Sequence, residues 1–466
     1  MNFRNSCFVF LILLLSFIAS GKTPKYVFYF IGDGMGFNHI TATSFYQSDD
    51  ISDLSDKLVF THFPVTGIVN TRSATHYITD SSAGGTALAS GHKANNRSVG
   101  LNAKNEPVFS VVHKAKKNNW MTGIVTSTSV DDATPSSFYA HAENRNMYYE
   151  IGKQAANSSI NFLGGAGFKS YTNPQNQHDP HLLTYFAAAG YVVYKGFSQY
   201  INEIKYDQPV VLISKRDYPG TALPYAIDRT PEDLTLEQLT STAIDYFKNN
   251  KARRFMLVVE GGRIDHASHP NDGAAAITEL IDMEKSIRLA YDFYLKHPKE
   301  TLILLTSDHE TGGLALGIEG TVLNLQVLSN QKASLGKLSG LINELHVEYP
   351  AGVSWNHVIE LLKEQMGFWN EIPISKGDEV KLKTSYEDTF VTKTSKKIKT
   401  SYSVDEPLAK LAVEIINKHA NLGWTTNNHS GAAVPVFAIG AGADEFTGMM
   451  ENTDIPKKLE KICRLK

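Results

Sequence analysis

One stretch of this sequence concentrates side chains that could hold a metal ion. Directly after an apolar run, positions 260–269 hold four ionisable residues that could bind a metal ion: Glu260, Asp265, His266 and His269. Burying so many ionisable groups is costly unless a cation compensates their charge. Histidine nitrogen and carboxylate oxygen are ligands suited to zinc, and an oxygen-rich set suits magnesium. The stretch therefore indicates a metal centre.

The residue Pro270 bears on the local structure of this stretch. Asp265 and His269 have the i, i+4 spacing of residues that share a helical face. However, a proline disfavours helical backbone in the residue before it. We therefore expect these two ligands on a loop, followed by a helix over 271–296.

Other apolar runs also have candidate ligands beside them. They are Asp33 after 26–31, Asp132 and Thr134 after 120–127, Asp308 and His309 after 301–305, and His429 before 434–439. Taken alone, Asp33 fits a turn cap as well as a ligand, and Arg145, in the helix-like stretch 136–149, fits a solvated surface residue. In an open parallel sheet, however, ligands collect outside the carboxyl ends of the strands. A doubly wound sheet would bring these residues together.

A serine near a predicted helix N-terminus offers a nucleophile. Residues 79–91 run from the polar turn Thr79-Asp80-Ser81 into small helix-forming residues and end at a glycine. Unpaired backbone N–H groups and the helix dipole at that position favour a phosphate-like anion beside Ser81. Taken alone, the stretch also fits Asp80 or Ser81 as an ordinary N-cap. A catalytic serine needs a general base or metal ions to activate its hydroxyl.

The composition is that of a large folded α/β protein. The chain has 466 residues, of which 42% are hydrophobic and 20% charged, enough for a large core. Its continuous apolar runs are typical of strands buried on both faces. We predict a three-layer, doubly wound, mostly parallel central sheet with helices on both faces. Residues 316–425 lack a comparable ligand cluster and are predicted to form an inserted accessory subdomain, in which the Lys/Thr/Ser-rich stretch 376–399 forms a solvated face or a short edge hairpin.

The charge and the glycine spacing argue against nucleic acid and nucleotide binding. A formal net charge of −3 gives no overall attraction to nucleic acid or to anionic lipid, so no nucleic acid is expected as a specific partner. The motif Gly32-Asp33-Gly34-Met35-Gly36 lacks the later glycine of the dinucleotide fingerprint. Any anion must therefore bind at one local site.

The N-terminal segment has the pattern of a secretory signal. Residues 1–21 contain a positive residue and an apolar run that is too short to span a bilayer comfortably, so the mature chain is expected to be 22–466. Cys7 would leave with the signal, and Cys463 alone could form no internal disulfide. The basic stretch 455–466 has no hydrophobic tail, so no stable membrane anchor is expected. The sequence predicts an exported protein of the periplasm or the extracellular space.

Taken together, these motifs resemble those of the alkaline phosphatases. The resemblance rests on Ile31-Gly32-Asp33-Gly34-Met35-Gly36, Thr79-Asp80-Ser81, Asp132-Ala133-Thr134-Pro135, Arg145, the stretch 259–266, the stretch 307–313 and Asn428-His429-Ser430-Gly431. These motifs occur in the family's order and span most of the mature chain. The set is therefore far more specific than any one motif.

The resemblance implies a site with two zinc ions and one magnesium ion. One zinc would be held by Asp265, His269 and His429. The second zinc, beside Ser81, would be held by Asp33, Asp308 and His309. The magnesium would be held by Asp33, Thr134 and Glu260, with Asp132 acting through bound water.

The resemblance also implies an activity, the hydrolysis of small-molecule phosphate monoesters through a phosphoserine at Ser81. Arg145 would hold two phosphoryl oxygens, and His266 would contact phosphate through water. A homodimer is implied as well. The sequence departs from some relatives at Ser82 and Gly84-Gly85, which makes the Ser82 hydroxyl a second candidate nucleophile.

Two other functions remain open at this point. A phosphodiesterase or sulfatase on the same metal-dependent scaffold would share most of the ligands, but a sulfatase would need a modification motif that this sequence lacks. A diesterase would have less need of Arg145. A non-catalytic exported protein that binds phosphate or metal would retain phosphate without turning it over.

Overall fold

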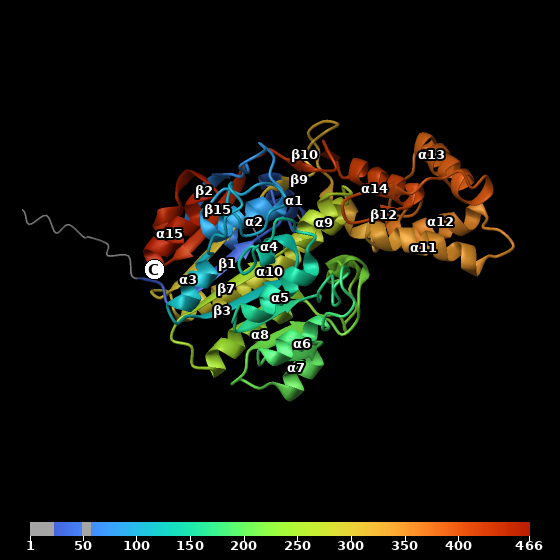
Figure 1. Ribbon diagram of the computed structural model, residues 1–466. Helices are drawn as coiled ribbons and strands as arrows, with labels where there is room; N and C mark the ends of the chain where they lie inside the picture. Colours follow the sequence, from blue (N-terminus) through green and yellow to red (C-terminus); the bar gives the residue numbers. More distant parts are fainter. Residues whose placement is uncertain (1–22, 49–56) are drawn as a thin grey trace, which may run out of the picture.

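A ten-stranded sheet forms the centre of the molecule in this computed structural model, which describes residues 23–48 and 57–466 (Figure 1). The predicted signal segment 1–21 lies outside the described residues. In spatial order the strands are β16 (Gly448–Glu451), β2 (Val65–Asn70), β15 (Val434–Gly440), β8 (Thr301–Thr306), β1 (Tyr26–Ile31), β7 (Phe255–Glu260), β3 (Met121–Thr126), β4 (Phe162–Gly165), β6 (Val210–Ile213) and β5 (Val192–Lys195). β15 runs antiparallel to β2 and β8, and every other neighbouring pair is parallel. The predicted mostly parallel sheet is confirmed.

The central strand β1 shows why the apolar runs lack alternation. Val27 and Tyr29 pack into the core on one face of the sheet, and Phe28 and Phe30 pack into the core on the other. All four side chains are buried. A strand covered by helices on both faces has no solvent side, so every position favours an apolar residue.

Helices cover both faces of the sheet and complete the three layers. The core on the first face includes side chains from α2 (Ser81–Ser90), α3 (Val111–Lys117), α5 (Tyr148–Asn157), α6 (Leu182–Ala188) and α15 (Asp454–Cys463). The core on the second face includes side chains from α1 (Phe37–Tyr46), α7 (Phe197–Glu203), α8 (Leu236–Asn249), α9 (Arg263–Ser268) and α10 (Gly273–Lys296). Cys463 is a free thiol at the end of α15, and its burial raises its pKa to about 12.

A helical lobe, defined here as residues 317–421, projects from one end of this body (Figure 1). The chain leaves the body after β10 (Leu314–Leu316) and returns through β13 (Leu422–Trp424), and these two strands pair antiparallel. The lobe contains α11 (Leu335–Glu348), α12 (Trp355–Met366), α13 (Lys376–Tyr386), the hairpin β11 (Ile398–Lys399) and β12 (Val404–Asp405), and α14 (Pro407–His419). Its helices share a core that includes Leu338, Ile342, Val358, Leu362, Leu382 and Val413.

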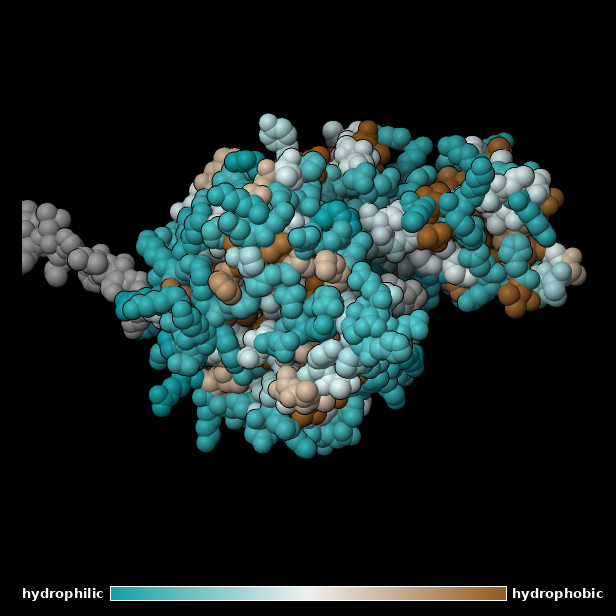
Figure 2. Space-filling model, in the orientation of Figure 1, coloured by the Kyte–Doolittle hydropathy of each residue, from teal (hydrophilic) through white to brown (hydrophobic). Residues whose placement is uncertain are grey.

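The Lys/Thr/Ser-rich stretch 376–399, predicted as a solvated face or a short edge hairpin, is mostly exposed to solvent but is not mainly a hairpin. Its first part, residues 376–386, forms α13, because Ser375 caps the helix by accepting from the Asp378 amide at 3.1 Å. Only residues 398–399 enter a hairpin. The face of the molecule shown in Figure 2 is mainly hydrophilic, with hydrophobic residues more frequent on the lobe. Among residues 23–48 and 57–466, no helix combines the length and the hydrophobicity needed to cross a bilayer.

Candidate active site

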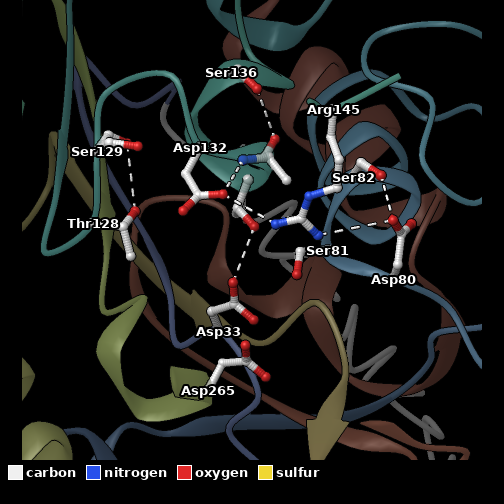
Figure 3. A network of polar contacts seen from close by, with 12 residues as sticks. Asp33, Asp80, Ser81, Ser82, Thr128, Ser129, Asp132, Ser136, Arg145 and Asp265 are labelled. Atoms are coloured by element: carbon white, nitrogen blue, oxygen red, sulfur yellow. Dashed lines mark hydrogen bonds and ion pairs between the residues drawn. The ribbon is translucent and has the colours of Figure 1, made fainter. Parts of the chain in front are cut away.

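Ser81 is the first residue of α2, and its hydroxyl faces the candidate ligands. Asp80 caps the helix by accepting from the Ala83 amide at 3.0 Å, and the helix ends at Gly91, whose φ of 77° suits glycine. Ser81 is buried, and its Oγ lies 3.2 Å from His309 Nε2. Ser82 Oγ donates to Asp80 Oδ2 at 2.6 Å instead (Figure 3). Of the two candidate hydroxyls, only that of Ser81 is directed to the histidine.

The carboxyl ends of adjacent parallel strands bring the acidic residues together. Asp33 follows β1, Glu260 ends β7 and Asp308 follows β8, and β1 lies between the other two strands. His309 Nε2 lies 3.4 Å from Asp33 Oδ1 and 3.3 Å from Asp308 Oδ2. Potential ligand atoms of these three residues all lie within 4.8 Å of one another.

His429 joins this group through a short strand pair. β14 (His429–Ser430) pairs antiparallel with β9 (Glu310–Thr311), which directly follows His309. Potential ligand atoms of Asp265, His309 and His429 also lie within 4.8 Å of one another, and His269 Nε2 lies 3.4 Å from Asp265 Oδ2. His309 therefore belongs to both groups.

Backbone carbonyls fix the ring orientation of two of these histidines. His269 Nδ1 lies 2.6 Å from the Asn427 carbonyl oxygen, and His429 Nδ1 lies 2.8 Å from the Thr79 carbonyl oxygen. Because a carbonyl only accepts, each Nδ1 carries the proton in the neutral ring, and each Nε2 keeps its lone pair. The two Nε2 atoms lie 3.2 Å apart. A cation bound by both lone pairs would remove their repulsion. Histidines that bind a metal through one ring nitrogen often donate the N–H of the other to a backbone carbonyl.

The electrostatics of the buried carboxylates also fit a cation. Asp33 Oδ1 and Asp265 Oδ2 are buried without a hydrogen-bond partner. Burial, with the charge of Asp265, raises the pKa of Asp308 to about 7, and burial raises that of Glu260 to about 8. Burial lowers the pKa of His309 well below its usual value. Burial disfavours the carboxylate anions, which a neighbouring cation would stabilise, and it keeps the histidine neutral, with a nitrogen lone pair free to bind that cation. Both properties match the ligand chemistry of zinc.

The remaining predicted ligands lie around these two groups. Thr134, in the short helix α4 (Ala133–Ser136), donates to Asp33 Oδ2 at 3.3 Å and to Asp308 Oδ2 at 3.4 Å. Glu260 accepts from the hydroxyls of Thr126 and Thr128. Hydroxyl and carboxylate oxygens are the ligands that magnesium prefers. Neither Glu260 nor Asp132 belongs to the two groups described above.

The predicted loop at Asp265 and His269 is wrong. Asp265 lies in α9, and His269 is its C-cap with helical backbone at φ −57° and ψ −46°. The His269 amide donates to the Asp265 carbonyl at 3.0 Å. Contacts of His269 with Asn427 on both its ring and its carbonyl outweigh the bias from Pro270. The following helix α10 begins at Gly273 rather than at residue 271.

Arg145 also differs from its predicted helical setting. It lies in a turn between α4 and α5, where its amide donates to the Arg97 carbonyl at 2.8 Å. Its Nη2 donates to Asp132 Oδ1 at 3.0 Å, and its Nη1 lies 3.9 Å from Asp80 Oδ2. Figure 3 shows the guanidinium between these two carboxylates and beside Ser81. The arrangement places a cation where oxygens of a bound phosphoryl group would need one.

Lys169 is a site residue that sequence reasoning missed. Its Nζ donates to Asp132 Oδ2 at 2.7 Å. Burial acts to raise the pKa of Asp132, but Lys169 and Arg145 together hold it below its usual range. Lys169 follows the end of β4 by four residues, so its place after a short apolar strand was the available signal. His266, by contrast, has a pKa lowered by burial and by Arg263, and its Nδ1 lies 3.0 Å from Arg263 Nη1.

In this doubly wound sheet, carboxylates and a histidine at the strand ends lie beside further histidines and beside a serine at a helix N-terminus. This arrangement defines a metal-dependent hydrolase type of site. The sequence model of the alkaline phosphatase family matches residues 24–163 and 218–465 of this chain. The chain therefore belongs to the alkaline phosphatase family, and it is a phosphatase. Residues 164–217, which include Lys169, fall outside the match.

Named relatives agree with this family. Alkaline phosphatase 4 of Bacillus subtilis strain 168 is 31% identical over 446 residues, covering 93% of this chain and 87% of the relative. An alkaline phosphatase of Schizosaccharomyces pombe is 30% identical over 467 residues, covering 95% and 81%. The solved structure of a cold-active alkaline phosphatase from a psychrophilic Shewanella species has a TM-score of 0.78 at 26% identity, covering 94% of this chain and 99% of that one. These similarities extend over nearly the whole chain.

Proposed function

We propose that this phosphatase hydrolyses small-molecule phosphate monoesters to an alcohol and inorganic phosphate through a phosphoserine at Ser81. The observation that carries the proposal is the convergence of three features. The Ser81 hydroxyl faces His309, Arg145 lies beside it, and two overlapping groups of buried and half-buried candidate ligands adjoin it. A nucleophile, a cation for phosphoryl oxygens and a metal centre are the parts that phosphoryl transfer requires.

The proposed cofactors are two zinc ions and one magnesium ion. We assign one zinc to Asp265, His269 and His429. We assign the other to Asp33, Asp308 and His309. We assign the magnesium to Asp33, Thr134 and Glu260, with Asp132 acting through water. Bound zinc supplies Lewis-acid stabilisation to the attacking and leaving oxygens of an in-line displacement.

Each residue of the site then has its own role in the proposed reaction. Ser81 Oγ attacks phosphorus, forming the new P–O bond while the bond to the leaving oxygen breaks, and the proton lost by Ser81 ends on that oxygen, so that an alcohol departs. Arg145 holds two non-bridging oxygens, which favours a monoester dianion over a diester. His266 contacts the phosphoryl group through water. Water then attacks the phosphoserine, so that phosphate leaves and the Ser81 hydroxyl is restored.

A comparison of two substrates tests this proposal. The purified protein, supplied with zinc and magnesium, is assayed on the mono- and diesters of 4-nitrophenol, and its metal content is measured. We expect faster monoester turnover, with more than one zinc per chain. Faster diester turnover would assign the protein to the phosphodiesterases of the same superfamily. Bound phosphate with no turnover would make it a binding protein.

The proposed setting of the enzyme is export as a homodimer. Residues 1–21 would be removed as a signal peptide, leaving 22–466 as one catalytic domain with an accessory insertion about 316–425, in the periplasm or outside the cell. N-terminal sequencing of the mature protein tests the cleavage, and an intact Met1 on the protein would contradict it. Light scattering of the purified protein tests the dimer.

A further inference from the structure

One side chain of the helical lobe, that of Tyr402, lies in the candidate active site of the body. In the hairpin, Ile398 pairs with Asp405 and Lys399 pairs with Val404. The Thr400 amide donates to the Ser403 carbonyl at 2.9 Å, which leaves Ser401 and Tyr402 at the tip. Ser401 is exposed, whereas Tyr402 is partly buried.

Tyr402 contacts residues that belong to the body rather than to its own lobe. Its ring stacks on His266, with centroids 3.7 Å apart and planes inclined by 25°. Its hydroxyl oxygen accepts from Arg145 Nη2 at 3.4 Å. Since the same Nη2 donates to Asp132 at 3.0 Å, its two N–H groups are shared between a carboxylate of the body and a phenol of the lobe.

Two direct bonds between lobe and body and one bond within the lobe fix the position of this hairpin. Lys410 Nζ, on α14, donates to the Pro270 carbonyl at 2.8 Å, directly after the candidate ligand His269. The Leu335 amide, at the start of α11, donates to buried Asp272 at 2.7 Å. At the base of the hairpin, the Glu406 amide donates to Ser339 Oγ at 3.0 Å. The tip is therefore positioned by the lobe as a unit.

We propose that Tyr402 is a positioning residue through which the lobe holds the Arg145 guanidinium in its phosphate-binding orientation. Arg145 has many rotamers, and fixing one end of its guanidinium before phosphate binds reduces the entropy lost on binding. Asp132 fixes that end from the body, and Tyr402 fixes it from the lobe. The inference rests on the proposed monoesterase function, because it assigns Arg145 to phosphate.

Three variants and a double variant test the proposal. Tyr402→Phe keeps the stacked ring and removes the hydroxyl, Tyr402→Leu removes both, and Ser401→Ala is the matched control on the same hairpin tip. Each is loaded with zinc and magnesium and checked for metal content and thermal unfolding. We measure kcat and KM on 4-nitrophenyl phosphate and on an alkyl monoester, and the Kd of inorganic phosphate by calorimetry.

We expect Tyr402→Phe to weaken phosphate binding and to raise KM about three- to tenfold for both esters, as for the loss of one hydrogen bond. Tyr402→Leu should weaken phosphate binding and raise KM further, and the phosphate Kd and the KM of Ser401→Ala should stay within about twofold of the wild-type values. In an Arg145→Ala background, Tyr402→Phe should have no further effect, because its target is gone.

Several outcomes would overturn the role of Tyr402. An unchanged phosphate Kd in Tyr402→Phe would do so, and so would an equal loss in the Arg145→Ala background. A rise in KM confined to the aryl ester would indicate instead that Tyr402 contacts the leaving group of the substrate. If wild type hydrolyses neither ester, the proposed function fails, and the phosphate titration still decides whether Tyr402 acts on Arg145.

Discussion

The carboxyl edge of the sheet and the helical lobe both reach the active site, but they place side chains by different means. At the sheet edge, Asp33, Glu260 and Asp308 end or follow adjacent parallel strands, so the backbone alone brings them together. From the lobe, Tyr402 arrives on a hairpin tip whose position depends on bonds such as Lys410 to Pro270. The positions of strand-end residues thus follow from the local sequence, whereas the position of a lobe residue depends on how the lobe packs against the body.

Removing metal should have the largest effect and should act on the site in the body rather than on the lobe. Chelation removes the cation that we place beside the buried oxygens of Asp33 and Asp265 that have no hydrogen-bond partner, so we expect monoester turnover to fall to background and thermal stability to drop. Zinc with magnesium should restore both. The lobe core, which includes none of the candidate ligands, should keep its amide-exchange protection. Full turnover after exhaustive chelation and dialysis would contradict the metal mechanism.

Arg145→Ala comes next, because it removes the cation that lies between the two regions. A charge-assisted fork contributes a few kcal/mol, so kcat/KM for a monoester should fall about ten- to a thousandfold. A diester has one fewer charged oxygen to bind and should lose less. Parallel assays on both esters of one phenol measure the difference. Equal losses on the two substrates would reject the assigned role.

Lys169→Met tests a residue at the sheet edge outside the family match. It leaves buried Asp132 with Arg145 as its remaining cation partner, so we expect about a tenfold loss of kcat/KM and weaker magnesium dependence. The matched control is Lys153→Met, which breaks a more exposed pair with Glu150 and should change activity less than twofold. Similar effects of the two substitutions would remove Lys169 from the site.

Loosening the lobe should have the smallest effect. Lys410→Met removes the bond to the Pro270 carbonyl, and we expect KM to rise about two- to fivefold as Tyr402 loses its fixed position. Lys418→Met, at the more exposed end of the same helix, is the control. The effect should disappear in a Tyr402→Phe background. An additive loss would show that the lobe acts by another route.

The sequence predicts the sheet edge well because its motifs directly follow buried strands. Asp33, Asp308 and His309 lie close together, as expected. The carbonyls that orient His269 and His429 were not predicted, because they come from segments distant in sequence. The helical backbone at His269 was missed because tertiary contacts outweighed the bias from proline.

No sequence motif predicts two of the contacts. The Tyr402 ring meets His266 across 136 positions of sequence, from 266 to 402, and the lobe's Lys/Thr/Ser-rich composition gives no sign of it. Lys169 reaches Asp132 from a loop with no motif of its own. Such residues are placed by docking of loops and lobes, which neither periodicity nor spacing encodes.

The most direct test of the account is the identification of the residue that carries phosphate during turnover. The zinc- and magnesium-loaded enzyme is mixed with excess 4-nitrophenyl phosphate, quenched in acid and digested, and the phosphopeptide is sequenced by mass spectrometry. Ser81→Ala and Ser82→Ala are treated in the same way. The account predicts phosphoserine at position 81 in wild type and in Ser82→Ala, and none in Ser81→Ala. Phosphate on Ser82, or steady turnover by Ser81→Ala at the wild-type rate, would contradict it.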